Sequence, residues 1–367
     1  MSRLCGAEML GRLLNVSPKP DRDLSDVDFT RAAQTALDAH LGARLFVEIQ
    51  RLGLEGRFTP EVLQSLRIQH LRIVLRNRAL RRRAVDVLRR FAAEGIVAIA
   101  MKGGVALFGQ PETRDCTRHM ADLDLLVAAE HSQTCHRLLA EMGFISVHDY
   151  DIADMHHGPT QRDRKFGLAL EVHTRPVEAN WSGFTTAFIA QSESVALTDD
   201  VTVRLPSGHH QILHNMIHAQ YSDRGFILGD ADLRHLFEFA EKCGRLGQAS
   251  RTALIGDAAL LGLRPHLLSW IYAAHRIFGL KLPPDLRFRA SERHQFRHIR
   301  NRELLPHFAA ATERVALYHL FVLDGVFSPR ELGAYYRYWA ERALQLLHVG
   351  PEPRVPEGGW PRGRGYG

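Results

Sequence analysis

The stretch from Ala121 to Ala128, ADLDLLVA, constrains the fold of this chain more than any other feature. Side chains of a β-strand alternate between the two faces of a sheet, so a strand here would place Asp122 and Asp124 on one face and two leucines on the other. Neighbouring carboxylates repel each other, and a bound cation would relieve that repulsion. Mg²⁺ prefers hard oxygen ligands of this kind. The alternation therefore predicts a strand with a candidate metal site, although pairs of solvated aspartates at strand ends are also common.

Short apolar runs on either side of this stretch predict the rest of a small sheet. The runs cover residues 96–102, 144–150, 168–174 and 201–205. Helical periodicity over residues 105–109 and 130–142 separates them, and Gly143 is placed to end the second helix. These patterns predict a mixed α/β core of the α+β class, with a small mixed sheet between N-terminal and C-terminal helical regions.

Helical patterns flank this core in the sequence. Apolar residues recur at steps of three and four from Phe29 to about Ala93, where Thr59-Pro60 is typical of a helix start. The same periodicity covers residues 209–348, where Ser328 begins a capping-box signature. We therefore predict an N-terminal helical region at 1–93, a core at 94–207, a C-terminal helical domain at 208–349 and a disordered tail at 350–367 that is rich in Gly, Pro and Arg.

The composition excludes several classes of protein. The four cysteines lie far apart and show neither zinc-binding nor disulfide-framework spacing: Cys5, Cys116, Cys135 and Cys243. No segment reaches the roughly 18 apolar residues of a membrane span, and the N-terminus lacks a secretory signal pattern. We therefore expect a cytoplasmic protein with no membrane partner. A net charge of +6 suits an anionic partner such as a nucleotide or RNA, but a solvated arginine-rich surface is the commoner reason for it.

The run from Leu168 to Thr174, LALEVHT, places Glu171 and His173 on one face of its predicted strand. If this strand lies beside the aspartate strand, Glu171 completes a cluster of three carboxylates. Such a cluster could hold two metal ions across an in-line phosphoryl displacement. Asp163 is a competing third acid, but its Gln-Arg-Asp-Arg context favours a salt bridge. His173 could orient an acceptor or act as a base, and a structural hydrogen bond is the alternative.

Lys102-Gly103-Gly104 falls at a predicted strand-to-helix turn. Glycines at such a turn let backbone N–H groups approach a phosphate, and the helix dipole adds to the attraction. Because the turn precedes the aspartate strand, it is a candidate cradle for a triphosphate, whereas a Gly-Gly turn alone is more often only a turn. Arg114 and Arg118 could bind the triphosphate or stabilise the transferring phosphoryl group, and surface solvation is the alternative.

Two further clusters allow a functional interpretation that we do not favour. His210, His214 and His218 recur at helical four-residue steps beside His209, as zinc ligands can, but a helix that lines the cleft explains them better. The arginines between residues 76 and 90 could bind RNA. They lack the interleaved aromatic residues of a single-strand binder, so a solvated helix face is the preferred interpretation.

Three of these segments together, MKGGVALFG, RHMADLDLLV and LEVHTR, resemble the uncharacterised nucleotidyltransferase family of the polymerase-beta-like superfamily. The resemblance covers residues 95–245. The positions that match the family pattern are Lys102, Gly103, Arg118, Asp122, Asp124, Gly143, Phe144, Glu171 and His173. LRHLFEFA resembles a later helical motif of the family, which normally carries Asp where this chain has Glu238.

The chain departs from the family pattern at two positions. Ala121 stands where the family usually has Gly, and Gly104 stands where many superfamily members have the Ser of a Gly-Ser pair. Neither change removes a carboxylate, so activity is still expected. The missing hydroxyl at Gly104 could weaken phosphate binding.

The resemblance implies a nucleotidyltransferase fold and a metal-dependent enzyme. It would move a nucleoside monophosphate from a nucleoside triphosphate such as ATP to an acceptor and release pyrophosphate. The catalytic residues, which would also hold Mg²⁺ or Mn²⁺, are Asp122, Asp124 and Glu171. The residues that would bind the nucleotide are Lys102, Gly103, Gly104, Arg118 and His173. The acceptor stays open among a small molecule, a peptide, a protein and an RNA. The alternatives are a catalytically decayed protein that binds a nucleotide or a partner, and a toxin-type transferase that modifies tRNA or protein.

Overall fold

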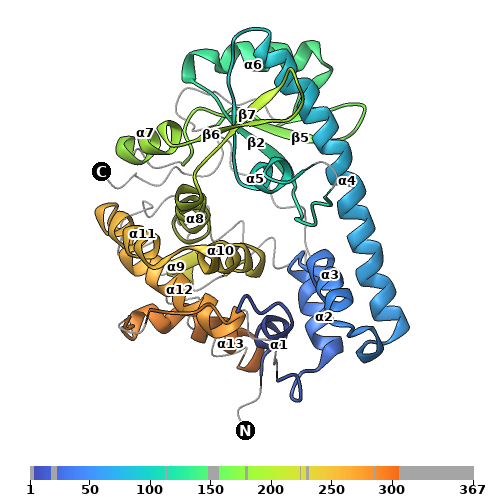
Figure 1. Ribbon diagram of the computed structural model, residues 1–367, viewed down its shortest axis with the longest axis vertical. Helices are drawn as coiled ribbons and strands as arrows, with labels where there is room; N and C mark the ends of the chain where they lie inside the picture. The colour runs from blue at the N-terminus through green and yellow to red at the C-terminus, as the bar shows by residue number, and fades with distance from the viewer. Residues whose placement is uncertain are drawn as a thin grey trace, which may run out of the picture.

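A computed structural model of the chain describes residues 4–17, 23–111, 114–147, 157–177, 181–223, 225–228, 231–283 and 286–305. Figure 1 shows the sheet at one end of the molecule, a body of helices at the other, and one long helix along the side between them. The predicted tail at 350–367, the predicted helices beyond residue 305 and the capping signature at Ser328 lie outside the described residues.

Seven strands form one mixed sheet in the order β3-β4-β5-β2-β1-β7-β6. Their bounds are β1 (Ile99–Ala100), β2 (Asp122–Leu126), β3 (Phe144–Ser146), β4 (Gln161–Asp163), β5 (Ala169–His173), β6 (Glu193–Ala196) and β7 (Thr202–Leu205). The neighbours β2 and β5 are parallel, β1 and β2 are antiparallel, and β1 and β7 are parallel. This arrangement confirms the predicted mixed α/β class.

Each of the five predicted strands contains an observed strand that is shorter than predicted. The last residues of the predicted third strand, 148–150, lie outside the described residues. Sequence patterns missed β4 and β6 because neither contains an apolar run, and β6 is an edge strand that is largely exposed.

The helices before the sheet are α1 (Gly6–Leu13), α2 (Phe29–Asp38), α3 (Gly42–Leu52) and α4 (Pro60–Ala92). Within the core lie α5 (Gly103–Phe108), α6 (Ser132–Glu141) and α7 (Ser182–Ala190). After it come α8 (Gly208–Met216), a π-helix (Ile217–Ser222), α9 (Gly225–Leu228), α10 (Leu233–Arg245), α11 (Gln248–Leu260), α12 (Arg264–Phe278) and α13 (His294–Leu304).

Two predicted helix boundaries are confirmed by local geometry. Thr59 caps α4 by accepting a hydrogen bond from the Val62 N–H, and Pro60 is its first residue. Gly143 follows α6 with a φ of 88°, a conformation that favours glycine, and lets the chain turn into β3.

The buried apolar side chains form two cores. One lies beneath the sheet and contains Leu123, Leu125 and the second half of α4 from Leu80 to Phe91. The other joins helices from both ends of the described chain, since α1 packs against α12 and Leu66 of α4 belongs to it. The sheet is thus held between an N-terminal helix and a mixed helical body. No described helix is long and apolar enough to cross a membrane.

A group of arginines on α4 links this helix to the strands, loops and helices of the core. Arg83 pairs with buried Asp163 at 2.5 Å, and Arg89 pairs with Asp200 at 2.6 Å. The group, called here the α4 arginines, comprises Arg78, Arg81, Arg83, Arg89 and Arg90, which reach Asp115, the Leu107 carbonyl, Asp163, Asp200 and Glu141 respectively. Asp163 therefore makes the salt bridge that its sequence context predicts. The α4 arginines are engaged within the chain and are not a purely solvated face.

Candidate functional site

The pairing of β2 with β5 sets the geometry of the site. In this parallel pair Asp124 lies opposite Glu171, and Asp122 lies opposite Ala169. Directly opposite residues point to the same face of a sheet, so the two carboxylates meet above it while Leu123 and Leu125 are buried below. The sequence analysis required that the strand of Glu171 lie beside the strand of Asp122 and Asp124, and in the structure the two strands are paired.

The structure brings Asp124, Glu171 and His173 into one group, with a ligand atom of each within 4.8 Å of the others. Asp122 lies on the same face but is not a member of this group. His173 is buried, and its Nε2 lies 2.9 Å from Asp124 Oδ1 and 3.6 Å from Glu171 Oε2. The ring thus contacts both carboxylates.

Lys102 supplies a second positive partner for Asp124. Its Nζ lies 2.7 Å from Asp124 Oδ1. The residue precedes α5 with a φ of 43°, which side-chain-bearing residues seldom adopt. Such strain is often found at functional sites. Here the turn leads directly from β1 into α5 and places the ammonium group on the carboxylate.

The charges of the site are unevenly balanced. Burial opposes ionisation of Asp124, but hydrogen bonds and charge from His173 and Lys102 hold its pKa far below the ordinary value. Burial likewise opposes ionisation of Glu171, yet hydrogen bonds from His173 and Thr160 lower its pKa to about 2. For Asp122 the balance is opposite, since burial and the charges of Asp124 and Glu171 raise its pKa. The face therefore carries more negative charge than its cations neutralise.

The donor set fits a hard divalent cation. Carboxylate oxygens are the ligands that Mg²⁺ prefers, and a cation would offset the repulsion that raises the pKa of Asp122. A cation bound to Asp124 would compete with Lys102 and His173, which now share its Oδ1 atom. Of the three predicted metal ligands, Asp124 and Glu171 lie in one group of possible ligands with His173, and Asp122 lies on the same face of the sheet.

The two glycines of the predicted cradle are held by close packing. A Cβ atom on Gly103 would lie 2.5 Å from Arg118 Nη1 and from the side chain of Met120. One on Gly104 would lie 3.0 Å from Ala100 Cβ and from Leu123 Cδ1, and the Gly104 N–H already donates to the Met101 carbonyl at 2.7 Å. Glycine at these positions therefore lets α5 approach the sheet closely.

The loop of residues 116–121, which leads into β2, is fixed from two sides. From α4, buried Asn77 donates to the carbonyls of Cys116 and Arg118 at 2.8 Å each, and Arg76 donates to the Ala121 carbonyl at 2.7 Å. From α10, Arg234 donates to the His119 carbonyl at 3.1 Å. The start of β2, which contains Asp122, is thus positioned by α4, which precedes the sheet in the chain, and by α10, which follows it.

Arg118 itself is paired with Glu238 of α10, with Nε and Oε1 2.8 Å apart, and both side chains are largely buried. The arginine that we predicted to bind the nucleotide is therefore paired with a carboxylate of the protein itself. Sequence reasoning noted Glu238 only as a departure within LRHLFEFA and gave it no role. Arg114 lies elsewhere, in the wall of a second, arginine-lined cavity with Arg78 and Arg82.

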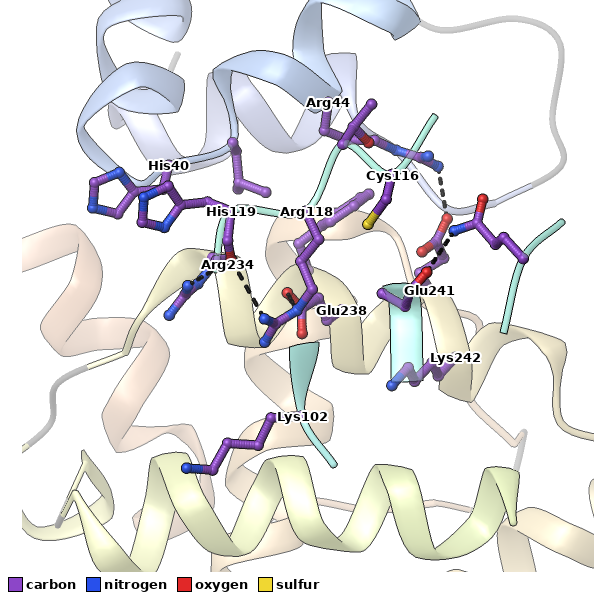
Figure 2. A pocket seen from close by; sticks show the side chains of 15 residues that line it. His40, Arg44, Lys102, Cys116, Arg118, His119, Arg234, Glu238, Glu241 and Lys242 are labelled. Carbon is purple, nitrogen blue, oxygen red and sulfur yellow. Dashed lines mark hydrogen bonds and ion pairs between the residues drawn. The ribbon is translucent and has the colours of Figure 1, made fainter. Parts of the chain in front are cut away.

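A cavity of about 110 Å³ lies between α3, α5, α10 and the loop of residues 116–121. Figure 2 shows the Arg118–Glu238 pair in its wall, with Lys102 and Lys242 at other positions around it. Lys102 joins this cavity to the carboxylates of the sheet. A smaller cavity of about 30 Å³ shares Lys102, Arg118, Glu238 and Lys242 and is also lined by His214, His218 and His235.

The predicted histidine series, which runs along α8 and into the π-helix at His218, does not converge on one point. His210 Nδ1 bonds to Ser207 Oγ at 2.9 Å, and His214 Nε2 bonds to the Pro176 carbonyl at 2.7 Å. His209 pairs with Asp257 at 2.6 Å. These contacts favour the interpretation that α8 lines the cleft, since His214 and His218 reach the smaller cavity.

Comparison with known proteins gives one family match. Residues 25–279 match a family described as uncharacterised nucleotidyltransferase. Among solved structures, the chain is similar to the solution structure of the antibiotic-resistance factor ANT(2'')-Ia, at 16% identity and a TM-score of 0.33, over 49% of this chain and 94% of that one. A likeness of that degree supports no argument about this chain. Comparison with curated proteins found no match.

Proposed function

The chain belongs to the uncharacterised nucleotidyltransferase family, and from that premise we propose that it transfers a nucleoside monophosphate from a nucleoside triphosphate to an acceptor, with release of pyrophosphate. The family match makes it a nucleotidyltransferase. The observation that supports the detailed reaction is the excess of carboxylate charge on the face shared by β2 and β5.

Asp122, Asp124 and Glu171 would hold Mg²⁺ or Mn²⁺ on that face. When bound, the metal would neutralise the triphosphate and the charge that develops on the leaving pyrophosphate. His173 would keep Asp124 and Glu171 in place through its contacts at 2.9 and 3.6 Å. Because the pKa of Glu171 is lowered to about 2, Glu171 is better suited to hold a cation than to remove a proton from the acceptor.

Lys102, Gly103 and Gly104 form the proposed nucleotide-binding turn. The Lys102 ammonium lies between Asp124 and the cavity of about 110 Å³, so it could leave the carboxylate for a phosphate when a metal takes its place. Ligand pockets usually measure about 300–1,000 Å³, so this cavity suits one part of a nucleotide or acceptor. Arg118 is paired with Glu238, and in this state we assign it the role of fixing the loop before Asp122. Arg118 would be available to a nucleotide only when this ion pair opens.

A catalytically decayed binding protein is the second candidate. Two contacts favour it: Lys102 already neutralises Asp124, and the Gly104 N–H is already bonded within the turn. The acceptor stays open among a small molecule, a peptide, a protein and an RNA, and the toxin-type transferase is one form of the last two.

The test uses nucleoside triphosphates labelled separately at the α- and γ-phosphorus, incubated with the protein, Mg²⁺ or Mn²⁺ and fractionated cell extract. We expect α-label in one acceptor fraction, no γ-label there, and pyrophosphate in equal amount. The double variant Asp122→Ala, Asp124→Ala should transfer no label. Its matched control replaces two exposed aspartates, Asp26→Ala and Asp199→Ala, and should label like the wild type. Nucleotide binding without any label transfer would favour the decayed binding protein.

A further inference from the structure

A second group of possible metal ligands lies outside the carboxylate cluster. His218 belongs to the π-helix, Asp223 follows it, and His235 is on α10. A ligand atom from each lies within 4.8 Å of the others. The π-helix continues α8, which packs against α10 (Figure 1), and the ring centroids of His218 and His235 lie 5.6 Å apart.

The π-helix itself creates the first half of the group. The Asp223 N–H donates to the His218 carbonyl at 2.9 Å, a hydrogen bond across five residues that is characteristic of π-helical turns. In an α-helix the His218 carbonyl would accept from the N–H of Ser222. The wider turn instead places the Asp223 carboxylate 2.9 Å from His218 Nδ1. Turns of this kind occur frequently at functional sites.

The third member is set by the start of α10. Asp232 caps this helix by accepting hydrogen bonds from the N–H groups of Arg234 and His235. His235 Nδ1 is buried and has no hydrogen-bond partner among the described residues. Its nearest ion-pair contact, to Asp232 Oδ2, is 3.8 Å long. A metal ion bound to this buried nitrogen would supply the partner that it lacks among the described residues.

Two arginines near this group have carboxylate partners of their own. Arg234 pairs with Asp232 at 3.2 Å, and Arg118 pairs with Glu238 at 2.8 Å. Two imidazoles meet one carboxylate, that of Asp223, and among the described residues its ion pair is with His218.

We propose that His218, Asp223 and His235 form a binding site for a first-row divalent transition cation, with Zn²⁺ as the favoured ion. Two histidines and one carboxylate are a frequent protein ligand set for Zn²⁺, with water in the fourth position. The site is separate from the group of Asp124, Glu171 and His173 and does not depend on the proposed transferase reaction. A bound ion would tie α10 to the π-helix in the wall of the smaller cavity.

Metal binding through His235 Nδ1 would require one local change. Arg234 Nη2 now donates to His235 Nε2 over a long 3.3 Å contact. A metal on Nδ1 leaves the ring proton on Nε2, so this contact would open. Arg234 would keep its bonds to Asp232 and the His119 carbonyl. Arg234→Met should therefore leave Zn²⁺ affinity unchanged or higher.

The experiment measures metal binding by the full chain after treatment with a chelator. Zn²⁺ affinity is obtained by calorimetry, and Co²⁺ is added as a spectroscopic probe because its visible absorption reports nitrogen and oxygen ligation. We expect one tight Zn²⁺ site in wild type. His218→Gln, Asp223→Asn and His235→Gln should each weaken it by about tenfold or more, since even the loss of outer-shell partners costs that much.

Two controls locate the site. His209→Gln breaks another His–Asp pair, 2.6 Å apart, and should keep wild-type affinity. The double variant Asp122→Ala, Asp124→Ala should also keep this Zn²⁺ site. The melting temperature of each variant without metal shows whether it folds. The proposal is overturned if wild type binds no Zn²⁺, if a folded His235→Gln binds it as tightly as wild type, or if the site is lost with the carboxylates of β2.

Discussion

The carboxylates above β2 and β5 and the α4 arginines are both sets of like charges, but the fold treats them in opposite ways. Each α4 arginine reaches a different segment of the core, namely two loops, α5, β4 and α6. The carboxylates converge on one place, where Lys102 and His173 share a single oxygen of Asp124. The separately paired arginines hold α4 against the core. The clustered carboxylates instead raise the pKa of Asp122, and a bound cation would relieve their repulsion.

The largest expected effect is on nucleotide transfer, when a carboxylate above β2 and β5 is removed. Asp124→Asn removes a central ligand, and nucleotide transfer should fall about a thousand-fold, because a metal contributes several kcal/mol of charge stabilisation. Transfer rates at saturating Mg²⁺ measure this. A variant that keeps wild-type transfer would remove Asp124 from the reaction.

For the α4 arginines the expected effect is on the stability of the fold. Arg83→Met leaves the buried Asp163 carboxylate without its ion-pair partner, and the free energy of unfolding should fall by about 3 kcal/mol. Denaturant titration measures the loss. The Mg²⁺ dependence of transfer should be unchanged in the folded fraction, and a shifted Mg²⁺ dependence would show that the two regions are not separate in function.

Glu171→Gln tests the division of labour inside the cluster. The variant should keep most nucleotide affinity, because Asp122 and Asp124 still hold a metal, and it should lose about a hundred-fold in transfer. Nucleotide binding and label transfer are measured on the same preparation. Equal loss of binding and transfer would mean that Glu171 acts in binding alone.

A smaller effect is expected in the pH dependence of stability. The folded-state pKa of Glu171 is lowered from 4.5 to about 2, so its contribution is present above about pH 4.5 and is lost as the pH falls toward 2. Between these values the melting temperature of wild type should fall more steeply than that of Glu171→Gln. Parallel curves would contradict the hydrogen bonds assigned to this carboxylate.

The smallest expected effect concerns the departure at Gly104. Serine at this position would add a hydroxyl to the proposed nucleotide-binding turn, but its Cβ would lie 3.0 Å from Ala100 Cβ and Leu123 Cδ1. These opposing terms should leave nucleotide affinity of Gly104→Ser within about threefold of wild type, a difference of less than 1 kcal/mol. Gly103→Ser is the contrasting variant, and it should bind markedly worse because its Cβ would lie 2.5 Å from Arg118 and Met120.

The sequence was sufficient to predict the features that depend on local pattern. The alternation around Asp122 and Asp124 fixed their common face, and the same rule applied to Glu171 and His173. The pairing of Arg118 with Glu238 joins residues far apart in the chain, so no spacing could reveal it. A zinc site that included His218 was considered from the sequence and not favoured, because only Asp223 lay near it, and His235 is contributed by a helix further along the chain.

The most direct test of the central assignment is a Mn²⁺ titration followed by electron paramagnetic resonance, with and without a nucleoside triphosphate. Wild type and the double variant Asp122→Ala, Asp124→Ala are compared with the surface control Asp26→Ala, Asp199→Ala. We expect protein-bound Mn²⁺ and metal-dependent nucleotide binding in wild type and in the surface control, and neither in the variant of β2. Equal Mn²⁺ and nucleotide binding by all three proteins would contradict the assignment of these carboxylates as the metal site.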